Sequence, residues 1–175
     1  MKRIISVILA AMMLLMIAPT AAHGKRAESR APYGYVEHEY EQLLAFMEQT
    51  NSAGVKNGTQ LSSAYDPNDP ETWGGIFWYI APTGFIHAEY IFFSTYDFPN
   101  RNLVGTLNLS GFSKLRAFGC AGNSITAVSI SDCPLLDELN VAQNLLTNFS
   151  VSNCAELRLV WCEENMLPSV SMSNL

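Results

Sequence analysis

The sequence predicts a mainly β protein built as a solenoid, a stack of similar coils whose first coil is covered by a helix and a β-hairpin. After residue 100, apolar residues recur every 21 residues in several parallel columns, and a fixed period of about 20 to 50 residues is typical of solenoids. Before the repeats, residues 35–49 carry a helical apolar pattern, and residues 76–80 and 85–93 are rich in aromatic and β-branched residues. These three observations predict the fold class.

The first residues have the pattern of a secretory signal peptide. Lys2 and Arg3 precede an apolar stretch over residues 4–18, and small residues lead to an expected cut after Ala22. Residues 23–34 are then a flexible linker. No second long apolar segment follows, so we expect no membrane span after cleavage and a secreted or cell-surface protein.

The charge balance argues against nucleic acid as a partner. The chain has a net charge of −6, and because the first 22 residues contain two cations and no acid, cleavage makes it −8. Binding to phosphates needs clustered Lys and Arg, which this sequence lacks.

Residues 35–101 are expected to form an N-terminal cap. In the helical segment, Tyr40, Leu43, Leu44 and Met47 fall on one helix face, and acids near its start suit a helix N-terminus. The two later runs are joined by Ala-Pro-Thr-Gly at 81–84, which fits a type I turn within a hairpin. Such a cap covers the open apolar end of a solenoid.

Residues 102–175 are the repeats, with an incomplete final copy. The 21-residue columns are Leu109, Ile130, Val151, Met172; Leu115, Leu136, Leu157; Phe118, Leu139, Val160; Cys120, Val141, Cys162; Ile125, Leu146, Leu167; and Asn102, Asn123, Asn144, Asn165. Alternation around residues 115–120 predicts one strand per coil, and a second pattern, as at Val128 and Ile130, predicts another. The Asn column is interpreted as a structural ladder in which amides bond backbone groups at a turn.

The repeat positions follow LxxLxCxxNxL, as in Leu115, Phe118, Cys120, Asn123 and Ile125. The chain therefore resembles the leucine-rich repeat superfamily, and its nested spacings of 10 and 11 resemble bacterial members in which extended chain replaces the convex helix. The resemblance implies few helices after residue 100. The cap is similar to that of plant-type leucine-rich repeats, through residues 43–46, the cluster Trp73, Gly75 and Trp78, and residues 102–107. It departs from them because no cysteine precedes residue 120.

The four cysteines are expected to be small buried hydrophobes. Cys120 and Cys162 lie two coils apart, about 9 to 10 Å at a strand spacing near 4.8 Å, beyond disulfide reach. Cys133 and Cys154 are stacked neighbours and close enough, which leaves a disulfide open, although in-register stacking rarely supplies the required dihedral angle.

The two strand faces differ in their outward residues. The second strand presents ladders of small polar residues, such as Ser110, Ser131 and Ser152, which we interpret as structural. The first presents varied chemistry, and we expect a partner to bind there, with Trp161 as the main contact because Trp is enriched at binding hot spots. The surrounding candidates are Leu159, Glu163, Glu138 and Asn140. Alternatively, Trp161 shields the open end of the solenoid or is covered by further repeats.

The sequence predicts neither an enzyme nor a cofactor site. Asp66, Asn68, Asp69 and Glu71 offer oxygen ligands for calcium, but Pro67 and Pro70 interrupt the pattern, so a Pro-stiffened turn is the better account. The histidines have no partner that sequence spacing would make a nucleophile pair.

The expected function is binding of a protein or glycan, in adhesion or host interaction. The alternative is a structural spacer or accessory module of a larger secreted protein, which includes an enzymatic one. The final copy has no polar cap at Leu175, so we also expect either a truncated sequence or self-association through this end.

Overall fold

The computed structural model describes residues 31–96 and 101–175. The expected signal peptide and most of the expected linker, residues 1–30, lie outside the described residues. The helices are α2 (Glu37–Met47), α3 (Asn57–Leu61) and the 3-10 helix η1 (Pro70–Thr72). The strands are β1 (Ile76–Ile80), β2 (Ile86–Phe92), β3 (Val104–Ser110), β4 (Ala117–Gly119), β5 (Ser124–Ser131), β6 (Glu138–Asn140), β7 (Asn148–Ser152), β8 (Leu159–Trp161) and β9 (Ser171–Ser173). No helix in the described ranges is long and apolar enough to cross a membrane.

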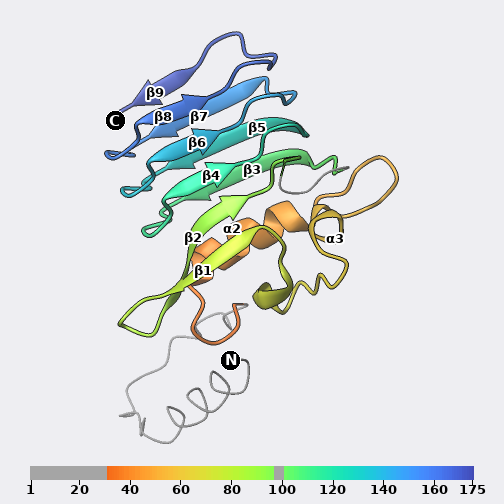
Figure 1. Cartoon of the computed structure of the whole chain (residues 1–175), viewed down its shortest axis with the longest axis vertical. Coiled ribbons are helices and arrows are strands. Elements are labelled where there is room, and N and C mark those ends of the chain that lie inside the picture. Colours follow the sequence, from red (N-terminus) through yellow and green to blue (C-terminus); the bar gives the residue numbers. More distant parts are fainter. Residues whose placement is uncertain (1–30, 97–100) are drawn as a thin grey trace, which may run out of the picture.

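The repeats form a β-solenoid of about three coils, as the 21-residue period predicts. One parallel sheet contains β4, β6 and β8, and the other contains β3, β5, β7 and β9. Strand partners along both sheets are 21 residues apart, as in Ala117 with Glu138 and Ala127 with Asn148. Figure 1 shows these strands stacked along the long axis of the molecule, with α2 at the end away from the C-terminus. Within residues 101–175 there is no helix, as expected.

Each coil turns through left-handed backbone at two corners. One corner holds Gly111, Asp132, Asn153 and Asn174, and the other holds Gly122, Gln143 and Glu164, all with φ between 52° and 76°. Gly, Asn and Asp adopt this conformation with the least strain, so the first corner uses suitable residues in every coil. These corners reverse the chain from one sheet to the other.

The predicted apolar columns point into the solenoid and form its core. Phe118 and Leu139 are buried, as are Leu115 and Leu136. In the outermost coil the same columns are only partly covered, at Leu157, Val160, Cys162 and Leu167. The core therefore runs from the cap through the middle coils and thins at the C-terminal end.

The N-terminal helix and hairpin are both confirmed. Helix α2 is two residues shorter at each end than predicted, and it buries Tyr40, Leu43, Leu44 and Met47. Strands β1 and β2 pair antiparallel across a turn in which the Gly84 N–H donates to the Ala81 carbonyl at 2.8 Å. Strand β2 then pairs parallel with β4, so the hairpin extends the first sheet to the order β1-β2-β4-β6-β8.

Glu39 lies in the first turn of α2, where an acidic side chain suits the helix N-terminus, and it also bonds to β2. Its side chain is 1% exposed, and its carboxylate accepts from the Ala88 N–H at 2.8 Å and contacts His87 Nδ1 at 2.9 Å. A buried carboxylate needs such partners. Glu39 therefore ties α2 to β2.

Side-chain amides cover the first strand of the second sheet. Gln49 donates to the Thr106 carbonyl and accepts from the Thr106 N–H, both at 2.7 Å. Gln42 makes the same pair of bonds with Ser110, Asn57 with Val104, and Gln60 with Asn102. Each amide offers a donor and an acceptor, as a neighbouring strand would. These amide clamps satisfy an edge that would otherwise be open to pairing.

Candidate binding surface

The solvent side of the five-stranded sheet, here called the variable face, carries the predicted partner residues. In one cross-strand row Leu159 lies beside Glu138, and in the next row Trp161 lies beside Asn140. Glu163 follows β8 and is exposed, and its carbonyl accepts from the Gln143 N–H at 2.9 Å. The structure thus brings all five residues to one end of the face.

The apolar members of this group are accessible to solvent. Leu159 is 44% exposed and Trp161 38% exposed. Asn140 is half-buried, and its Oδ1 accepts from the Ala142 N–H at 3.2 Å, which leaves its NH₂ group to other partners. The group therefore combines apolar area with hydrogen-bonding groups.

The hairpin adds aromatic residues that the sequence reasoning missed. The rows continue through Ala117 to Tyr90 and Phe77, and through Gly119 to Phe92. Phe77 is 57% exposed, and its ring meets that of Phe92 edge-on with centroids 6.0 Å apart. The alternation of residues along the hairpin strands could have suggested that these rings face outward. However, Phe92 and its strand partner Gly119 are 27 residues apart, which differs from the 21-residue period. The sequence columns therefore gave no sign that the hairpin continues the sheet of the repeats.

Small side chains lie between the two apolar groups. Ala117 and Gly119 form the middle of the rows between β2 and β6. A Cβ added at Gly119 would contact only the Phe92 ring, at 3.7 Å. Strand β8 is three strand spacings from β2, or about 14 Å. The variable face therefore carries large apolar side chains at both ends and small side chains between them.

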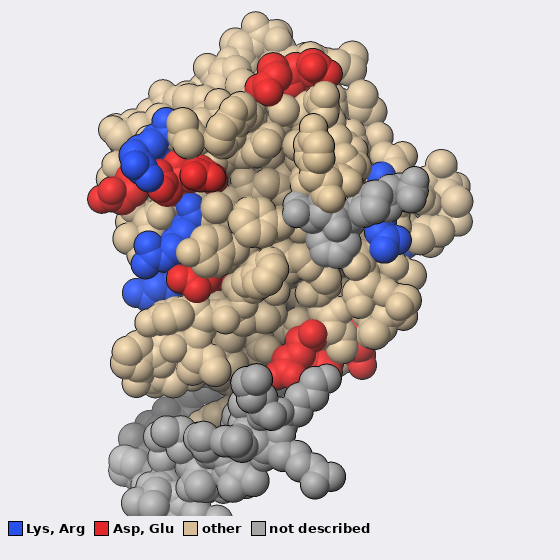
Figure 2. Space-filling model, in the orientation of Figure 1, with Lys and Arg blue, Asp and Glu red and all other residues tan. Residues whose placement is uncertain are grey.

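Charged residues line one margin of the repeats. Arg116 pairs with Glu89 at 3.1 Å, and Arg158 pairs with Asp137. Hydrogen bonding to Arg158 lowers the pKa of the Asp137 carboxyl. In Figure 2, blue and red side chains lie side by side along one edge of the visible face, whose centre is uncharged.

On the solvent side of the four-stranded sheet, the serine face, several polar side chains bond to one another. The Ser110 and Ser131 hydroxyls lie 2.8 Å apart, and the Ser150 hydroxyl donates to Ser129 at 3.2 Å. Asn153 donates to Asp132 at 2.8 Å. These groups use one another as partners along the stack.

Three of the four predicted ladder asparagines bond the backbone of two coils. Asn123, Asn144 and Asn165 each donate to carbonyls of their own turn and of the preceding layer, and each accepts a backbone N–H. Asn102 is exposed instead, and Gln60 bonds its backbone N–H and carbonyl. Asn102 differs from the other three because the cap, rather than another coil, lies before it.

The acidic run at residues 66–71 forms a turn. Asp66 Oδ1 accepts from the Asn68 N–H at 2.8 Å, and Asp69 Oδ1 accepts from the Glu71 N–H at 3.1 Å. These carboxylates thus cap local backbone. Across the described ranges, no group of three or more His, Cys, Asp or Glu side chains is placed to hold a metal ion.

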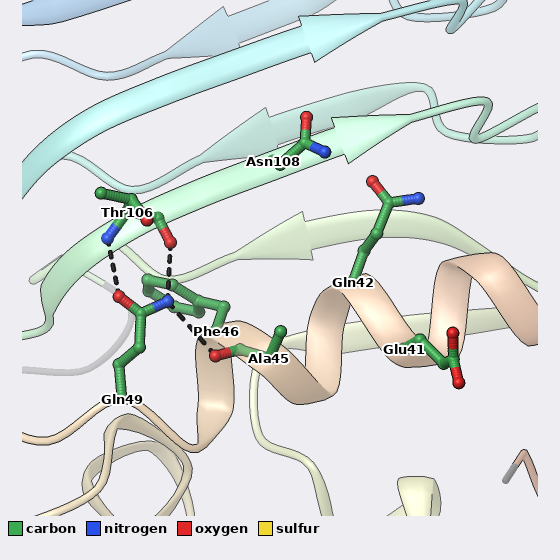
Figure 3. A pocket seen from close by; sticks show the side chains of 7 residues that line it. All are labelled: Glu41, Gln42, Ala45, Phe46, Gln49, Thr106 and Asn108. Atoms are coloured by element: carbon green, nitrogen blue, oxygen red, sulfur yellow. Dashed lines mark hydrogen bonds between the residues drawn. The ribbon is translucent and has the colours of Figure 1, made fainter.

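A shallow hollow of about 280 Å³ lies between α2 and β3. Its lining includes Gln42, Ala45, Gln49 and Asn108. Figure 3 shows Gln49 clamped to Thr106 and Glu41 pointing away from the strand. Ala45 is opposite the backbone of Asn108, where a clamp would continue the series but the side chain is too short. The hollow is the space left where no side-chain amide bonds to Asn108. Its one charged lining residue, Glu41, points away from it.

No protein-family model, curated protein or solved structure matches this chain.

Proposed function

We propose that the protein binds a protein or glycan partner on the variable face, outside the cell or at its surface. The observation that carries this proposal is the exposure of Phe77, Leu159 and Trp161 on one side of one sheet. Trp is among the residues most enriched at binding hot spots, and the exposed Phe and Leu side chains add apolar area that a partner would remove from water. Glu138 and Asn140, beside them, supply hydrogen-bonding groups that a partner would need for specificity.

The type of repeat and the export of the protein are also part of the proposal. The LxxLxCxxNxL pattern and the bonding of Asn123, Asn144 and Asn165 support a bacterial type of leucine-rich repeat with extended chain on both sides. The pattern of residues 1–22 supports export by a signal peptide. A binding role rather than a catalytic one is supported by the structural bonds that the carboxylates of Asp66, Asp69 and Glu39 make.

The test starts with glycan and protein arrays probed with the purified protein. Any partner found is titrated against the wild type, Trp161→Ala, Phe92→Ala and the control Ser129→Ala on the serine face. Loss of a hot-spot residue costs about 2 kcal/mol or more, so we expect the Kd to rise at least tenfold for Trp161→Ala. Ser129→Ala should bind as the wild type does.

Equal binding by the wild type and the triple variant Phe77→Ala, Phe92→Ala, Trp161→Ala would contradict the proposal. Circular dichroism of each variant checks that the fold is kept. All three side chains lie on the solvent side of the sheet, so their truncation leaves the core columns intact.

The second candidate function is a spacer or accessory module of a larger secreted protein. The observation that favours it is that polar side chains pair with one another, at Ser110 with Ser131 on the serine face and at the ion pairs Glu89 with Arg116 and Asp137 with Arg158. A spacer would tolerate Trp161→Ala with no loss of function. The same titration therefore separates the two functions.

We also propose that copies of the chain associate through the C-terminal end of the solenoid. In the described ranges β8 and β9 each pair on one side only, and Met166, Val170 and Met172 are 40 to 64% exposed there. Open strand edges next to apolar side chains favour pairing with another strand.

A further inference from the structure

Cys133 and Cys154 occupy the same corner of two consecutive coils. Each follows a left-handed residue, Asp132 or Asn153, and the strands that lead to them are paired at Ser131 and Ser152. The Asp132 N–H donates to the Ser152 carbonyl at 3.1 Å. The backbone at this corner is therefore held in register from one coil to the next.

The two side chains also point the same way. Each Sγ lies 3.3 Å from the carbonyl oxygen two residues earlier in its own coil, Ser131 for Cys133 and Ser152 for Cys154. Stacked coils are about 4.8 Å apart, and disulfides join Cα atoms about 4.4 to 6.8 Å apart. Cys133 Sγ also lies 3.7 Å from the Leu109 carbonyl oxygen in the coil before it. Disulfides join Cβ atoms about 3.5 to 4.5 Å apart, so bond formation requires rotation of at least one cysteine side chain about its Cα–Cβ bond and a small approach of the two coils.

The two thiols are free in the structure. The hydrogen bond from Cys133 lowers the pKa of the Cys154 thiol to about 7, and the same bond raises the pKa of Cys133. Burial raises the pKa of Cys120. The thiolate is the nucleophile in disulfide exchange. Cys154 lies one coil nearer the exposed end of the solenoid than Cys133, so it is the more accessible attacking group, and the lowered pKa of its thiol agrees with that role.

Access to the pair is from the outermost coil. Both cysteines are fully buried, but most side chains from residue 155 onward are exposed, and Leu175, next in the same column, is 51% exposed. Segments with little buried apolar area open at low free-energy cost. Opening of this coil would uncover Cys154 while the inner coils stay folded.

We propose that Cys133 and Cys154 are a dithiol that a low-molecular-weight disulfide oxidises to a bond between adjacent coils. The Cys154 thiolate attacks one sulfur of that disulfide and releases the first thiolate, which takes up the proton that Cys154 has lost. Cys133 then loses its proton and attacks Cys154 in the mixed disulfide, so that the second small thiol leaves. Two electrons and two protons pass to the small disulfide, which becomes two thiols.

The bond would hold the outer coil against the one before it. It closes a 21-residue loop in the unfolded chain, and a loop of this size is expected to raise the Tm by about 6 to 12 °C for a protein of this length. The proposal is independent of the proposed binding function, since neither cysteine lies on the variable face.

The test is to incubate the purified protein with oxidised glutathione and count free thiols in denaturant. We expect two of the four thiols to disappear. Cleavage at Asp132 and Glu138 should then leave the peptides containing Cys133 and Cys154 joined until a reductant is added, with Cys120 on a separate peptide. The oxidised protein should also melt at the higher temperature.

Matched variants test the pairing. Cys162→Ser should still lose two thiols, whereas Cys133→Ser and Cys154→Ser should form no cross-link between the peptides. Four retained thiols, glutathione adducts without a cross-link, or a cross-link to Cys120 would each overturn the proposal. The peptide map of the wild type decides the matter even where a variant does not fold.

Discussion

The buried asparagines show how one residue type joins successive coils. Asn144 donates to the carbonyls of Val141 and Ala142 in its own turn and of Cys120 in the coil before, at 3.0 to 3.2 Å, and it accepts from the Ile125 N–H at 3.1 Å. No apolar residue of similar size could satisfy these four backbone groups, which lie at a corner where strand pairing stops. The amide thus replaces the missing strand partner.

Asn144→Ala should therefore be strongly destabilising. Unpaired buried polar groups cost about 1 to 3 kcal/mol each, with partial relief from entering water, so we expect the free energy of unfolding to fall by about 2 to 4 kcal/mol. Urea denaturation followed by circular dichroism measures this.

Asn102→Ala is the matched control for this prediction. Asn102 belongs to the same sequence column but is exposed, so its replacement should change the free energy of unfolding by less than about 0.5 kcal/mol. Similar losses in the two variants would show that the column position, rather than the bonds of the buried amide, determines stability.

At the scale of elements, the cap closes the solenoid in two ways. Strand β2 continues the first sheet by ordinary strand pairing, whereas α2, α3 and the turn after α2 cover β3 and the residues just before it with side-chain amides, those of Gln42, Gln49, Asn57 and Gln60. A helix has no free backbone groups along its side, so it can satisfy a strand edge only through side chains. The clamps sit at alternate residues because alternate strand residues point their N–H and C=O groups to the same edge.

Gln49→Ala should weaken this contact locally. It removes both bonds to Thr106, and we expect a loss of about 1 to 2 kcal/mol in the free energy of unfolding together with faster hydrogen exchange at the Thr106 amide. Glu41→Ala on α2 is the control, because Glu41 points away from β3 (Figure 3). Unchanged exchange at Thr106 in Gln49→Ala would rule out the clamp as the source of protection.

Ala45→Gln should fill the gap in the clamp series. Ala45 is exposed, lines the hollow and lies between the two clamping residues Gln42 and Gln49. Gln is nearly as good a helix former as Ala, so a new pair of bonds with Asn108 should slow hydrogen exchange at the Asn108 amide and stabilise the fold by up to about 1 kcal/mol. Ala45→Leu, which has similar bulk but no amide, should leave that exchange unchanged.

At the scale of the whole molecule, the two ends are unlike. The cap end is closed by an aromatic cluster in which Tyr40 stacks on Trp73 with ring centroids 5.2 Å apart. At the other end, in the described ranges, β8 and β9 have free edges and the core columns are half-covered. This asymmetry is the basis of the proposed self-association.

Self-association should appear as an apparent mass that rises with protein concentration. Size-exclusion chromatography with light scattering measures it, and Met172→Lys should reduce it because a charge on an edge strand opposes pairing. Ser129→Lys, on the same sheet but away from the edge, is the control. A single monomer peak at every concentration would disprove the proposed association.

The sequence by itself determined the solenoid. In stacked coils each residue sits above its equivalent one period earlier, so the environment of a position repeats and leaves a column in the sequence. That is why the two strands of each coil, the inward columns and the roles of Asn123, Asn144 and Asn165 could be read from spacing alone. The two faces of the coil could be distinguished for the same reason, and Leu159 and Trp161 could be placed together.

Only the tertiary structure decided how the cap meets the coils. The bond between Glu39 and Ala88, the clamp between Gln49 and Thr106, and the rows that carry Phe77, Tyr90 and Phe92 onto the variable face join segments that share no period. The exposed position of Asn102 has the same origin, since a first coil has a cap where later coils have a neighbour. A periodic pattern specifies contacts between equivalent positions, and contacts between different kinds of element depend on the folded geometry.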